Sequence, residues 1–460
     1  MALLGALPAL AALAVFGILH TPDTPGYLTY AEQIRTGTVP NGAALLASGP
    51  SPVSLFRAPG YSLVLAALQR VFPGAWQMAV VLLQIAAQAA VTGAAYRAAR
   101  ALGAGRERAT VAALLPAIGF GVVVQIALLT DGLYAALATG AALLLTRGRP
   151  GAAALAGLAL GCATLLREAT PFLMIGYLPL ALLVTDGRGR RLLCGALVLA
   201  GPAVAAGGLM AWNAARIGRP VLTTSRQTVM VQAVLPLLKK HLPVYDGDDR
   251  FDRIARETVG SGEYSAIDTL HDRLFREAGM SAPEIADAAT RRYVAAWRRF
   301  PGAMLMASLQ NFRHEFLAMP FQPVDTVGAL MVYAGWPRPV FDRLNLLWSA
   351  LRHGSAVAGL EIAADVLTRL LGTAISLLAI ATPLLLRGQS DRAARTRFGL
   401  WLVCCAFPAV YLPVHIEPRY LAPVVPLVCV LAACALPPGN RLASAGVQQR
   451  IMHSRSGTMA

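Results

Sequence analysis

The chain has 460 residues, of which 56% are hydrophobic and only 14% are charged. Soluble globular proteins carry about 25% charged residues, and the mean hydropathy of +0.56 excludes a water-soluble enzyme of this length. We therefore expect an integral membrane protein with several spans. The formal net charge is +16, and the only lysines are Lys239 and Lys240. Such arginine- and alanine-rich usage is typical of a GC-rich coding genome, so it does not indicate a nucleic-acid partner.

The cysteines indicate neither a disulfide framework nor a zinc site. All six lie inside apolar segments, and no CxxC motif or Cys/His metal-ligand spacing occurs. They are Cys162, Cys194, Cys404, Cys405, Cys429 and Cys434.

Ten apolar runs suit membrane spans, each of which needs roughly 20 apolar residues. The first run lacks a basic region and a clean cleavage site, so we expect a retained span rather than a signal peptide. The runs lie near 2–19, 76–96, 109–129, 132–146, 151–166, 170–185, 192–212, 364–386, 398–414 and 420–436. The expected fold is an all-α integral membrane bundle of about ten transmembrane helices, or twelve if 301–318 and 326–350 also span. Arg313, His314 and Glu315 interrupt the first of these two segments, which favours membrane-surface or re-entrant helices.

Arginine clusters set the expected orientation. They occur at 97–108, 147–149, 188–191 and 387–397. If all four are cytoplasmic, the spans between them come in pairs and the positive-inside rule holds throughout. Both termini are then cytoplasmic. The expected organisation is an N-terminal transmembrane module (1–212) with a first outer loop (20–75), an extracytoplasmic region (213–360), C-terminal transmembrane helices (361–436) and a cytoplasmic tail (437–460).

One helix is predicted within the long outer region. Ser281 and Glu284 form a capping-box pattern at its start. Its apolar residues follow helical spacing: Ile285, Ala289, Tyr293, Trp297 and Phe300. The pattern predicts either an amphipathic helix at the membrane interface or a packing helix of a small outer domain. We find no sequence repeat, which argues against an inverted-repeat transporter.

Four acidic residues, Asp23, Asp131, Glu168 and Glu417, lie at the expected outer ends of apolar segments. Acidic groups in a membrane are costly and usually face a cavity or a partner. The alternative for each of them alone is a carboxylate that meets water at a helix end. Asp23, held among two prolines and a glycine, is the strongest candidate for a general base or a ligand of a divalent cation. Asp131 also suits a turn or a helix cap, and Glu168 would also suit an ion pair with Arg167.

The basic candidates are Arg57, Arg419 and the pair Lys239–Lys240, which precedes His241. The planar guanidinium fork of arginine matches a phosphate. The alternative for both arginines is snorkelling to the outer headgroups. For the lysines, contact with an anionic substrate and a solvated loop both stay open.

The order of these motifs resembles the GT-C polytopic glycosyltransferases. An acidic residue follows the first span, Arg57-Ala-Pro-Gly-Tyr61 closes the first outer loop, and a carboxylate occupies the second outer turn. The closest resemblance is to the dolichyl-phosphate-mannose–protein mannosyltransferase and aminoarabinose–lipid A transferase group. Further matches, which together cover most of 15–430, are Gly157-Leu-Ala-Leu-Gly161 leading to Arg167, Trp212-Asn213 followed by 218–225, and Glu417-Pro-Arg-Tyr420-Leu-Ala-Pro423.

This resemblance implies a GT-C-like bundle, a sugar donor carried on a polyprenyl phosphate, an active site at the extracytoplasmic face and inversion at the anomeric carbon. Asp23 would deprotonate the acceptor hydroxyl or help hold a divalent metal (Mg²⁺ or Mn²⁺), with support from Asp131. No other cofactor is expected. Cationic groups would stabilise the leaving phosphate. The expected substrate-binding residues are Arg57, Tyr61, Glu168, Lys239, Lys240, His415, Glu417, Arg419 and Tyr420.

One departure bears on the acceptor. Protein mannosyltransferases sometimes carry an acidic pair in the first loop, but here Thr24 follows Asp23. We therefore expect transfer to a lipid or glycan rather than to a protein. The expected partners are the lipid-linked donor, that acceptor and membrane lipids. Composition and chain length favour the bacterial inner (plasma) membrane, with the site on the periplasmic side.

Two other functions stay open. A lipid-linked-sugar transporter or flippase would share the hydrophobicity and topology, but would place charges at mid-membrane, where this chain has few. An O-antigen-type polymerase or ligase would place its key arginines in a large outer loop, and 213–360 would accommodate them. A structural scaffold explains none of the outer-end carboxylates.

Overall fold

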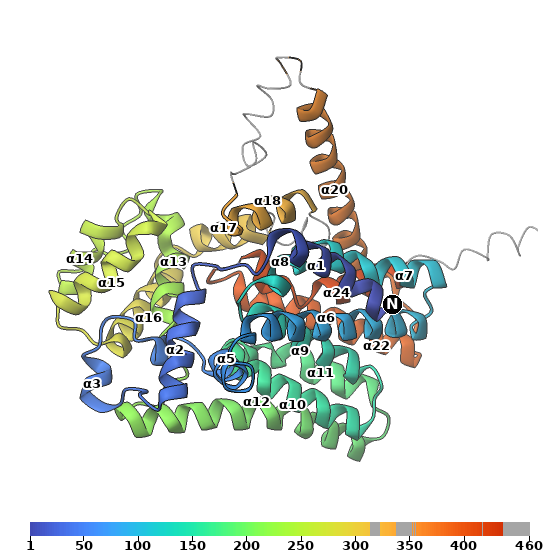
Figure 1. Cartoon of the computed structure of the whole chain (residues 1–460), viewed down its shortest axis with the longest axis horizontal. Helices are drawn as coiled ribbons and strands as arrows, with labels where there is room; N and C mark the ends of the chain where they lie inside the picture. Colours follow the sequence, from blue (N-terminus) through green and yellow to red (C-terminus); the bar gives the residue numbers. More distant parts are fainter. Residues whose placement is uncertain (313–322, 337–351, 353, 355, 416, 436–460) are drawn as a thin grey trace, which may run out of the picture.

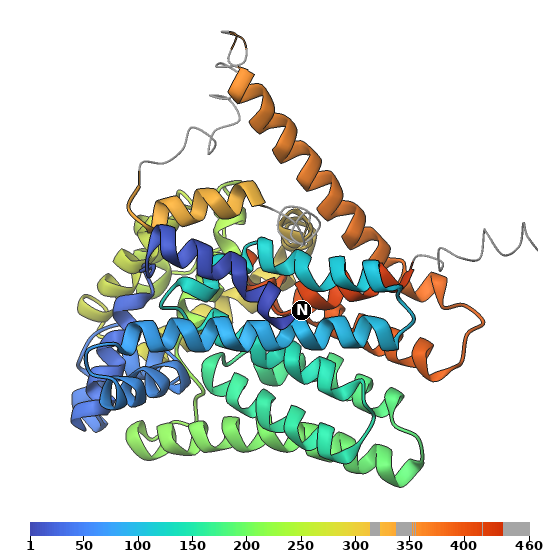
Figure 2. The ribbon, with the colours of Figure 1, turned by 45° about the vertical axis from the view of Figure 1, so that its right-hand side comes forward.

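The computed structural model describes residues 1–312, 323–336, 352, 354, 356–415 and 417–435. Over these residues the chain is all-helical, as predicted, and its β-pairing is limited to an isolated parallel bridge between Leu19 and Ala127. Long helices run side by side along the longest axis of the molecule (Figures 1 and 2).

The helices that correspond to the predicted spans pack around one apolar core. They are α1 (Ala2–Phe16), α6 (Trp76–Ala101), α7 (Arg106–Leu114), α8 (Gly121–Ile126), α9 (Asp131–Leu145), α10 (Pro150–Leu166), α11 (Met174–Val184), α12 (Arg188–Ile217), α20 (Ala356–Ile380), α21 (Thr382–Leu385), α22 (Arg392–Tyr411) and α24 (Val425–Ala435), with the 3₁₀ turns η1 (Leu115–Ile118) and η2 (Thr170–Leu173).

Three helices in the described part of the chain are long and apolar enough to cross a bilayer: α6, α12 and residues 362–380 of α20. Several others have only 10–17 residues, or about 15–26 Å at 1.5 Å per residue. Ten or twelve spans therefore remain a prediction. The run near 109–129 is not one continuous helix, because it is broken into α7, η1 and α8 around Pro116 and Gly119. The two segments of uncertain role contribute α17 (Pro301–Asn311) and α18 (Pro323–Tyr333), while 313–322 and 337–350 lie outside the described residues, as does 437–460.

The predicted first loop contains four helices. They are α2 (Thr24–Thr36), α3 (Gly42–Leu46), α4 (Val53–Phe56) and α5 (Gly60–Val71). Arg216, near the end of α12, fixes this loop by donating to the Pro40 carbonyl at 2.8 Å and to Ser54 Oγ at 2.9 Å. Asn213 holds the chain after α12 by donating to the Val221 carbonyl at 2.8 Å. The Trp212-Asn213 motif thus lies where the loop is fastened to the bundle.

A second apolar core lies in a separate helical layer (Figure 1). It is built from α13 (Arg226–Leu238), α14 (Arg250–Val259), η3 (Tyr264–Ala266), α15 (Ile267–Arg276), α16 (Ala282–Arg299) and α17. The capping box of Ser281 and Glu284 is confirmed. The apolar face of α16 is covered by this core, with Ile285 and Ala289 buried in it, so α16 is a packing helix rather than an amphipathic helix free for the membrane surface.

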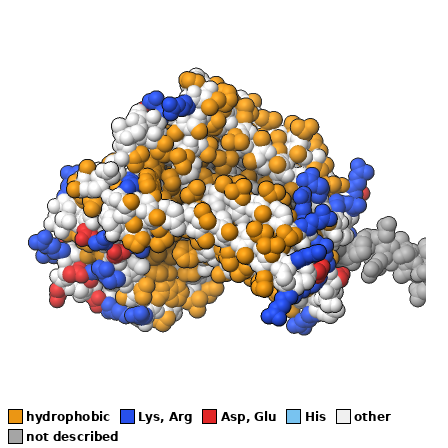
Figure 3. Space-filling model, turned by 90° about the horizontal axis from the view of Figure 1, so that it is seen from below, with side chains coloured by type: hydrophobic (Ala, Val, Ile, Leu, Met, Phe, Trp, Pro, Cys, Tyr) orange, Lys and Arg blue, Asp and Glu red, His pale blue; other side chains and the backbone are white. Residues whose placement is uncertain are grey.

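The four arginine clusters meet at one end of the bundle, which we call the basic end (97–108, 147–149, 188–191 and 387–397). Arg392 donates to the Arg147 carbonyl at 2.5 Å, and Arg395 pairs with Asp186 at 2.8 Å. Arg397 donates to the Cys434 carbonyl, and the Cys434 thiol contacts the Ala99 carbonyl. Figure 3 shows hydrophobic side chains across the middle of one face, with Lys and Arg gathered toward its two margins. This distribution fits a bundle whose apolar surface faces a membrane.

The contact between α10 and α12 depends on glycine. A Cβ at Gly157 would clash with the Leu197 carbonyl, and a Cβ at Gly201 would clash with the Gly157 carbonyl. A Cβ at Gly161 would lie 2.9 Å from the Gly201 carbonyl oxygen. The Gly157-to-Gly161 motif therefore allows two backbones to approach closely, as small-residue motifs do in membrane helices.

We predict that Gly201→Val destabilises the bundle by about 1–3 kcal/mol or more, because the new side chain forces α10 and α12 apart. Thermal unfolding of the purified protein in detergent measures this. Gly207→Val is the matched control on the same helix, since a Cβ at Gly207 meets nothing within 4 Å. Equal melting temperatures for the two variants would contradict the prediction.

Candidate active site

The first loop is tied directly to the turn before α9. The Leu19 amide donates to the Ile126 carbonyl at 3.0 Å, and the Leu128 amide donates to the Leu19 carbonyl at 3.0 Å. The Thr24 hydroxyl then donates to the Leu128 carbonyl at 3.1 Å. These bonds bring Asp23, at the start of α2, to the end of the bundle where Asp131 begins α9. This end, opposite the basic end, is called the site end below.

Asp23 lies between two arginines. Its Oδ1 accepts a hydrogen bond from Arg57 at 2.9 Å, and its Oδ2 accepts one from Arg419 at 2.5 Å. The Asp23 side chain makes no capping bond to its own helix, so both oxygens are used by the guanidinium groups. Arg57 also stacks over the Tyr27 ring at 4.4 Å. Gly26 permits this placement, because a Cβ there would lie only 2.7 Å from Arg57 Nε.

The Glu417-to-Tyr420 motif adds a second carboxylate to the same group. Arg419 Nε lies 2.6 Å from Glu417 Oε2, so one guanidinium joins two carboxylates. Glu417 Oε1 is 3.2 Å from His415 Nε2 and accepts a bond from the Tyr420 hydroxyl at 3.3 Å. The Glu417-to-Tyr420 segment, which the sequence predicted to bind substrate, therefore lies beside Asp23.

A third ion pair lies deeper. Asp131, whose side chain is 0% exposed, pairs with Arg167. The Arg167 guanidinium lies over the ring of Tyr420 at 4.3 Å and that of Tyr134 at 5.4 Å. The other Asp131 oxygen has no hydrogen-bond partner among the described residues. Arg419 and Asp23 are close enough to Asp131 to interact with it electrostatically. The site cluster, as we use the term, comprises three carboxylates and three guanidiniums: Asp23, Asp131, Glu417, Arg57, Arg167 and Arg419.

The two carboxyls outside the apolar helices are strongly acidic. Burial raises the pKa of Asp23, but Arg419 and Arg57 outweigh it and lower that pKa to about 2. Burial likewise opposes ionisation of Glu417, but His415 and Arg419 lower its pKa to about 2. Both groups are therefore ionised at neutral pH. A carboxylate with so low a pKa is a weak base for as long as the arginines hold it.

Two other predicted residues lie at the site end without joining the cluster. Glu168 accepts a hydrogen bond from Ser225, so it is fixed to the 218–225 segment rather than paired with Arg167. Tyr61 is fully buried, donates to Gln84 at 3.1 Å and packs edge-on against Tyr27 at 5.1 Å. It supports Tyr27, which in turn supports Arg57.

Lys239 and Lys240 are not brought to the cluster. Both are exposed at the end of α13 in the second layer. Lys239 lies against Gly262, close in sequence to Tyr264. The Tyr264 ring approaches His415 with 6.4 Å between ring centroids, and it marks the point where the second layer reaches the site.

Three residues at the site were not predicted as site residues. The sequence suggested Arg167 as a partner of Glu168, although its place after the Gly157-to-Gly161 motif was a signal for a separate role. Tyr264 and Tyr333 belong to no recognisable sequence motif. Both interact electrostatically with Asp23, Glu417 and Arg419, and tertiary folding alone brings them there.

The cluster offers little room for a metal at Asp23 as it is arranged. The described residues contain no group of three or more His, Cys, Asp or Glu side chains that could hold a metal ion. A cation at Asp23 would also have to displace a guanidinium from at least one carboxylate oxygen. The metal remains a prediction, and no chemical step below depends on it.

No family model matches the chain, and no curated protein matches it. Among solved structures it is similar to the archaeal oligosaccharyltransferase AglB from Archaeoglobus fulgidus in complex with an inhibitory peptide and a dolichol-phosphate, with 12% sequence identity and a TM-score of 0.42. The match covers 99% of this chain and 51% of that one, so the chain spans about half the length of that protein. A similarity this weak does not establish a shared activity.

The Asp23 pKa predicts a particular acid sensitivity. Since the pKa falls from 3.8 to about 2 in the folded protein, ionised Asp23 stabilises the fold above about pH 4. This stabilisation is lost as the pH falls toward 2. We expect the melting temperature of the wild type to drop more between about pH 6 and about pH 3 than that of Asp23→Asn.

Asp186→Asn is the control for this comparison, because Asp186 is a largely exposed partner of Arg395 at the basic end. It should retain the wild-type acid sensitivity. If Asp23→Asn were as acid-sensitive as the wild type, the two arginines would not hold Asp23 as described.

Proposed function

We propose that the protein is a GT-C-type glycosyltransferase. It moves a sugar from a polyprenyl-phosphate donor to a lipid or glycan acceptor, with inversion, at the extracytoplasmic face of the bacterial inner membrane. The observation that carries the proposal is the shared Asp23 carboxylate, whose two oxygens are held by Arg57 and Arg419. Those arginines come from the two segments whose sequences resemble GT-C motifs.

The arginines would bind the donor phosphate. The guanidinium fork matches a phosphate as well as a carboxylate, so an arriving donor would compete with Asp23 for Arg57 and Arg419. During transfer the bond between the anomeric carbon and the phosphate oxygen breaks, and its electron pair stays on the phosphate. Negative charge therefore builds on the leaving group, and the arginines stabilise the transition state more than the ground state.

The same exchange would activate Asp23. Its pKa is low because two guanidiniums face it, and burial alone raises that pKa. When the donor phosphate draws the arginines away, Asp23 becomes a stronger base. The acceptor hydroxyl then attacks the anomeric carbon and gives its proton to the Asp23 carboxylate. Phosphate binding and base activation would thus be coupled.

The buried pair of Asp131 and Arg167 would support the replacement of Asp23 by the donor phosphate at Arg57 and Arg419. Arg167 lies under the Tyr420 ring, next in the chain to Arg419, and so positions the segment that carries this arginine. The carboxylates of Asp131 and Glu417 would help balance the positive charge of the guanidiniums, with His415 held beside Glu417. The exposed Lys239 and Lys240 take no part in the proposed chemistry.

We predict that Asp23→Asn abolishes sugar transfer while the protein still inserts and folds. The assay uses membranes containing the protein and a panel of radiolabelled polyprenyl-phosphate sugars, with product formation as the readout. Asp186→Asn, an equivalent change at the basic end, should transfer at the wild-type rate.

Near-normal transfer by Asp23→Asn would remove Asp23 from the mechanism. If no donor gives product, and labelled lipid instead crosses the bilayer in vesicles that contain the protein, the transporter function replaces the transferase.

A further inference from the structure

We propose that an anionic glycerophospholipid binds in an apolar groove over α9. Its headgroup phosphate would lie between Arg97 and Arg147 at the basic end, and its acyl chains would run along the groove toward the site end. The lining of this groove contains none of the six residues of the site cluster, and the groove would exist whatever sugar the protein transfers.

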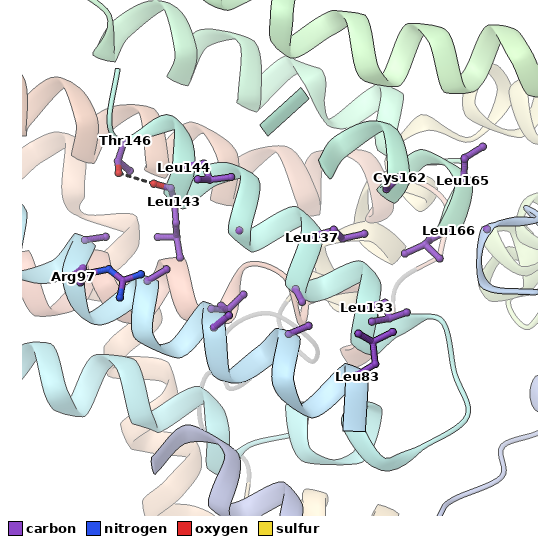
Figure 4. A pocket seen from close by; sticks show the side chains of 18 of the residues that line it. Leu83, Arg97, Leu133, Leu137, Leu143, Leu144, Thr146, Cys162, Leu165 and Leu166 are labelled. Carbon is purple, nitrogen blue, oxygen red and sulfur yellow. Dashed lines mark hydrogen bonds between the residues drawn. The ribbon is translucent and has the colours of Figure 1, made fainter. Parts of the chain in front are cut away.

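The groove has a volume of about 830 Å³ and is lined by α6, α9, α10 and the start of α5. Figure 4 shows Leu83, Leu133 and Leu166 toward one end, and Arg97 with Thr146 toward the other. Much of the lining in between is alanine and glycine, including Ala94 on α6 and Gly140 on α9. Because these side chains are short, the neighbouring helices do not fill the space between them.

Among the lining residues that the structure describes, the charged side chains are those of Arg97 and Arg147. Both are exposed, and neither side chain has an ion-pair partner among the described residues. Other arginines at the basic end are occupied: Arg395 pairs with Asp186, and Arg100 donates to the Ala104 carbonyl. Two unpaired guanidiniums at the mouth of an apolar groove complement a lipid with an anionic headgroup and apolar chains.

The length of the groove favours a phospholipid of one leaflet. From Leu133 on α9 to Arg147, two residues beyond the end of this helix, the chain advances about 21 Å at 1.5 Å per residue. Half of a bilayer core is about 15 Å, so acyl chains fit within the groove when the headgroup lies at the arginines. A polyprenyl donor with its phosphate at Asp23 would place its apolar tail among those guanidiniums instead, which is unfavourable.

The far end of the groove adjoins the buried ion pair of the site. Leu133 follows Asp131 by two residues, and Leu166 directly precedes Arg167. The acyl chains would therefore pack against the helix ends that carry Asp131 and Arg167. Occupancy would stabilise α6, α9 and α10 in the arrangement that pairs these two residues.

The test measures lipid binding by native mass spectrometry of the protein in detergent, with phosphatidylglycerol and phosphatidylcholine of identical acyl chains. We expect the wild type to prefer phosphatidylglycerol by about 30-fold, as two arginines near an anionic headgroup provide. The double variant Arg97→Gln/Arg147→Gln should lose this preference. Arg106→Gln/Arg149→Gln removes the same charge at the same end from residues that do not line the groove, and it should keep the preference.

A second pair of variants tests the groove itself. A Cβ at Gly140 meets nothing within 4 Å, so Gly140→Leu should fold normally, occupy the groove and weaken phosphatidylglycerol binding at least about tenfold. Gly207→Leu, on an equally open face of α12, should not weaken it. Unchanged binding in Gly140→Leu, or an unchanged preference in Arg97→Gln/Arg147→Gln, would overturn the proposal. So would undecaprenyl phosphate displacing phosphatidylglycerol at lower concentration than phosphatidylglycerol itself requires, because the groove would then hold the donor lipid.

Discussion

The carboxylate of Asp23 holds together parts of the chain that are far apart in sequence. Arg57 reaches it from 34 residues away and Arg419 from 396 residues away, and each takes one oxygen. Asp23 thus joins the first loop to the segment just before the last helix through two part-buried ion pairs. Both parts of the chain must keep these positions for the site to form. The bridge between Leu19 and the 126–128 segment holds the first loop against the turn before α9.

The apolar bundle keeps the two kinds of charge apart. Arginine clusters occupy the basic end, where they pair mainly with carbonyls and exposed carboxylates, while the site end carries three carboxylates matched by three guanidiniums. Helices α6, α9, α10 and α12 run between these ends, and the glycine contact of α10 with α12 allows them to pack closely. This arrangement needs little charge at mid-membrane, where an ionised group is expensive. In the proposed function, the donor phosphate would displace the internal ion pairs of this site.

The sequence predicted the helical class and the capping box at Ser281, because composition and caps are local signals. That Asp23, Arg57, Glu417 and Arg419 belong to one site was expected only from the order of the motifs that resemble GT-C enzymes. The sequence did not predict that Arg167 pairs with Asp131, or that Pro116 and Gly119 break the run near 109–129. Those outcomes depend on which helices become neighbours. The lysine pair was singled out because lysine is otherwise absent from the sequence, and the fold leaves Lys239 and Lys240 exposed at the end of α13, so their contact with a substrate stays a prediction. The groove over α9 had no signal at all, because alanine and glycine lining residues are indistinguishable from ordinary membrane-helix packing.

In the proposed mechanism, Asp23 and the donor phosphate compete for the same two arginines. This competition can be tested by measuring the affinity for undecaprenyl phosphate, without a sugar, of the purified wild type, Asp23→Asn and Arg419→Ala. We expect Asp23→Asn to bind this lipid severalfold more tightly than the wild type, because its arginines are no longer held by a carboxylate. Arg419→Ala should bind at least about tenfold more weakly, since a charge-assisted hydrogen bond is lost. Weaker binding by Asp23→Asn, or unchanged binding by Arg419→Ala, would show that Asp23 and the phosphate do not compete for these arginines.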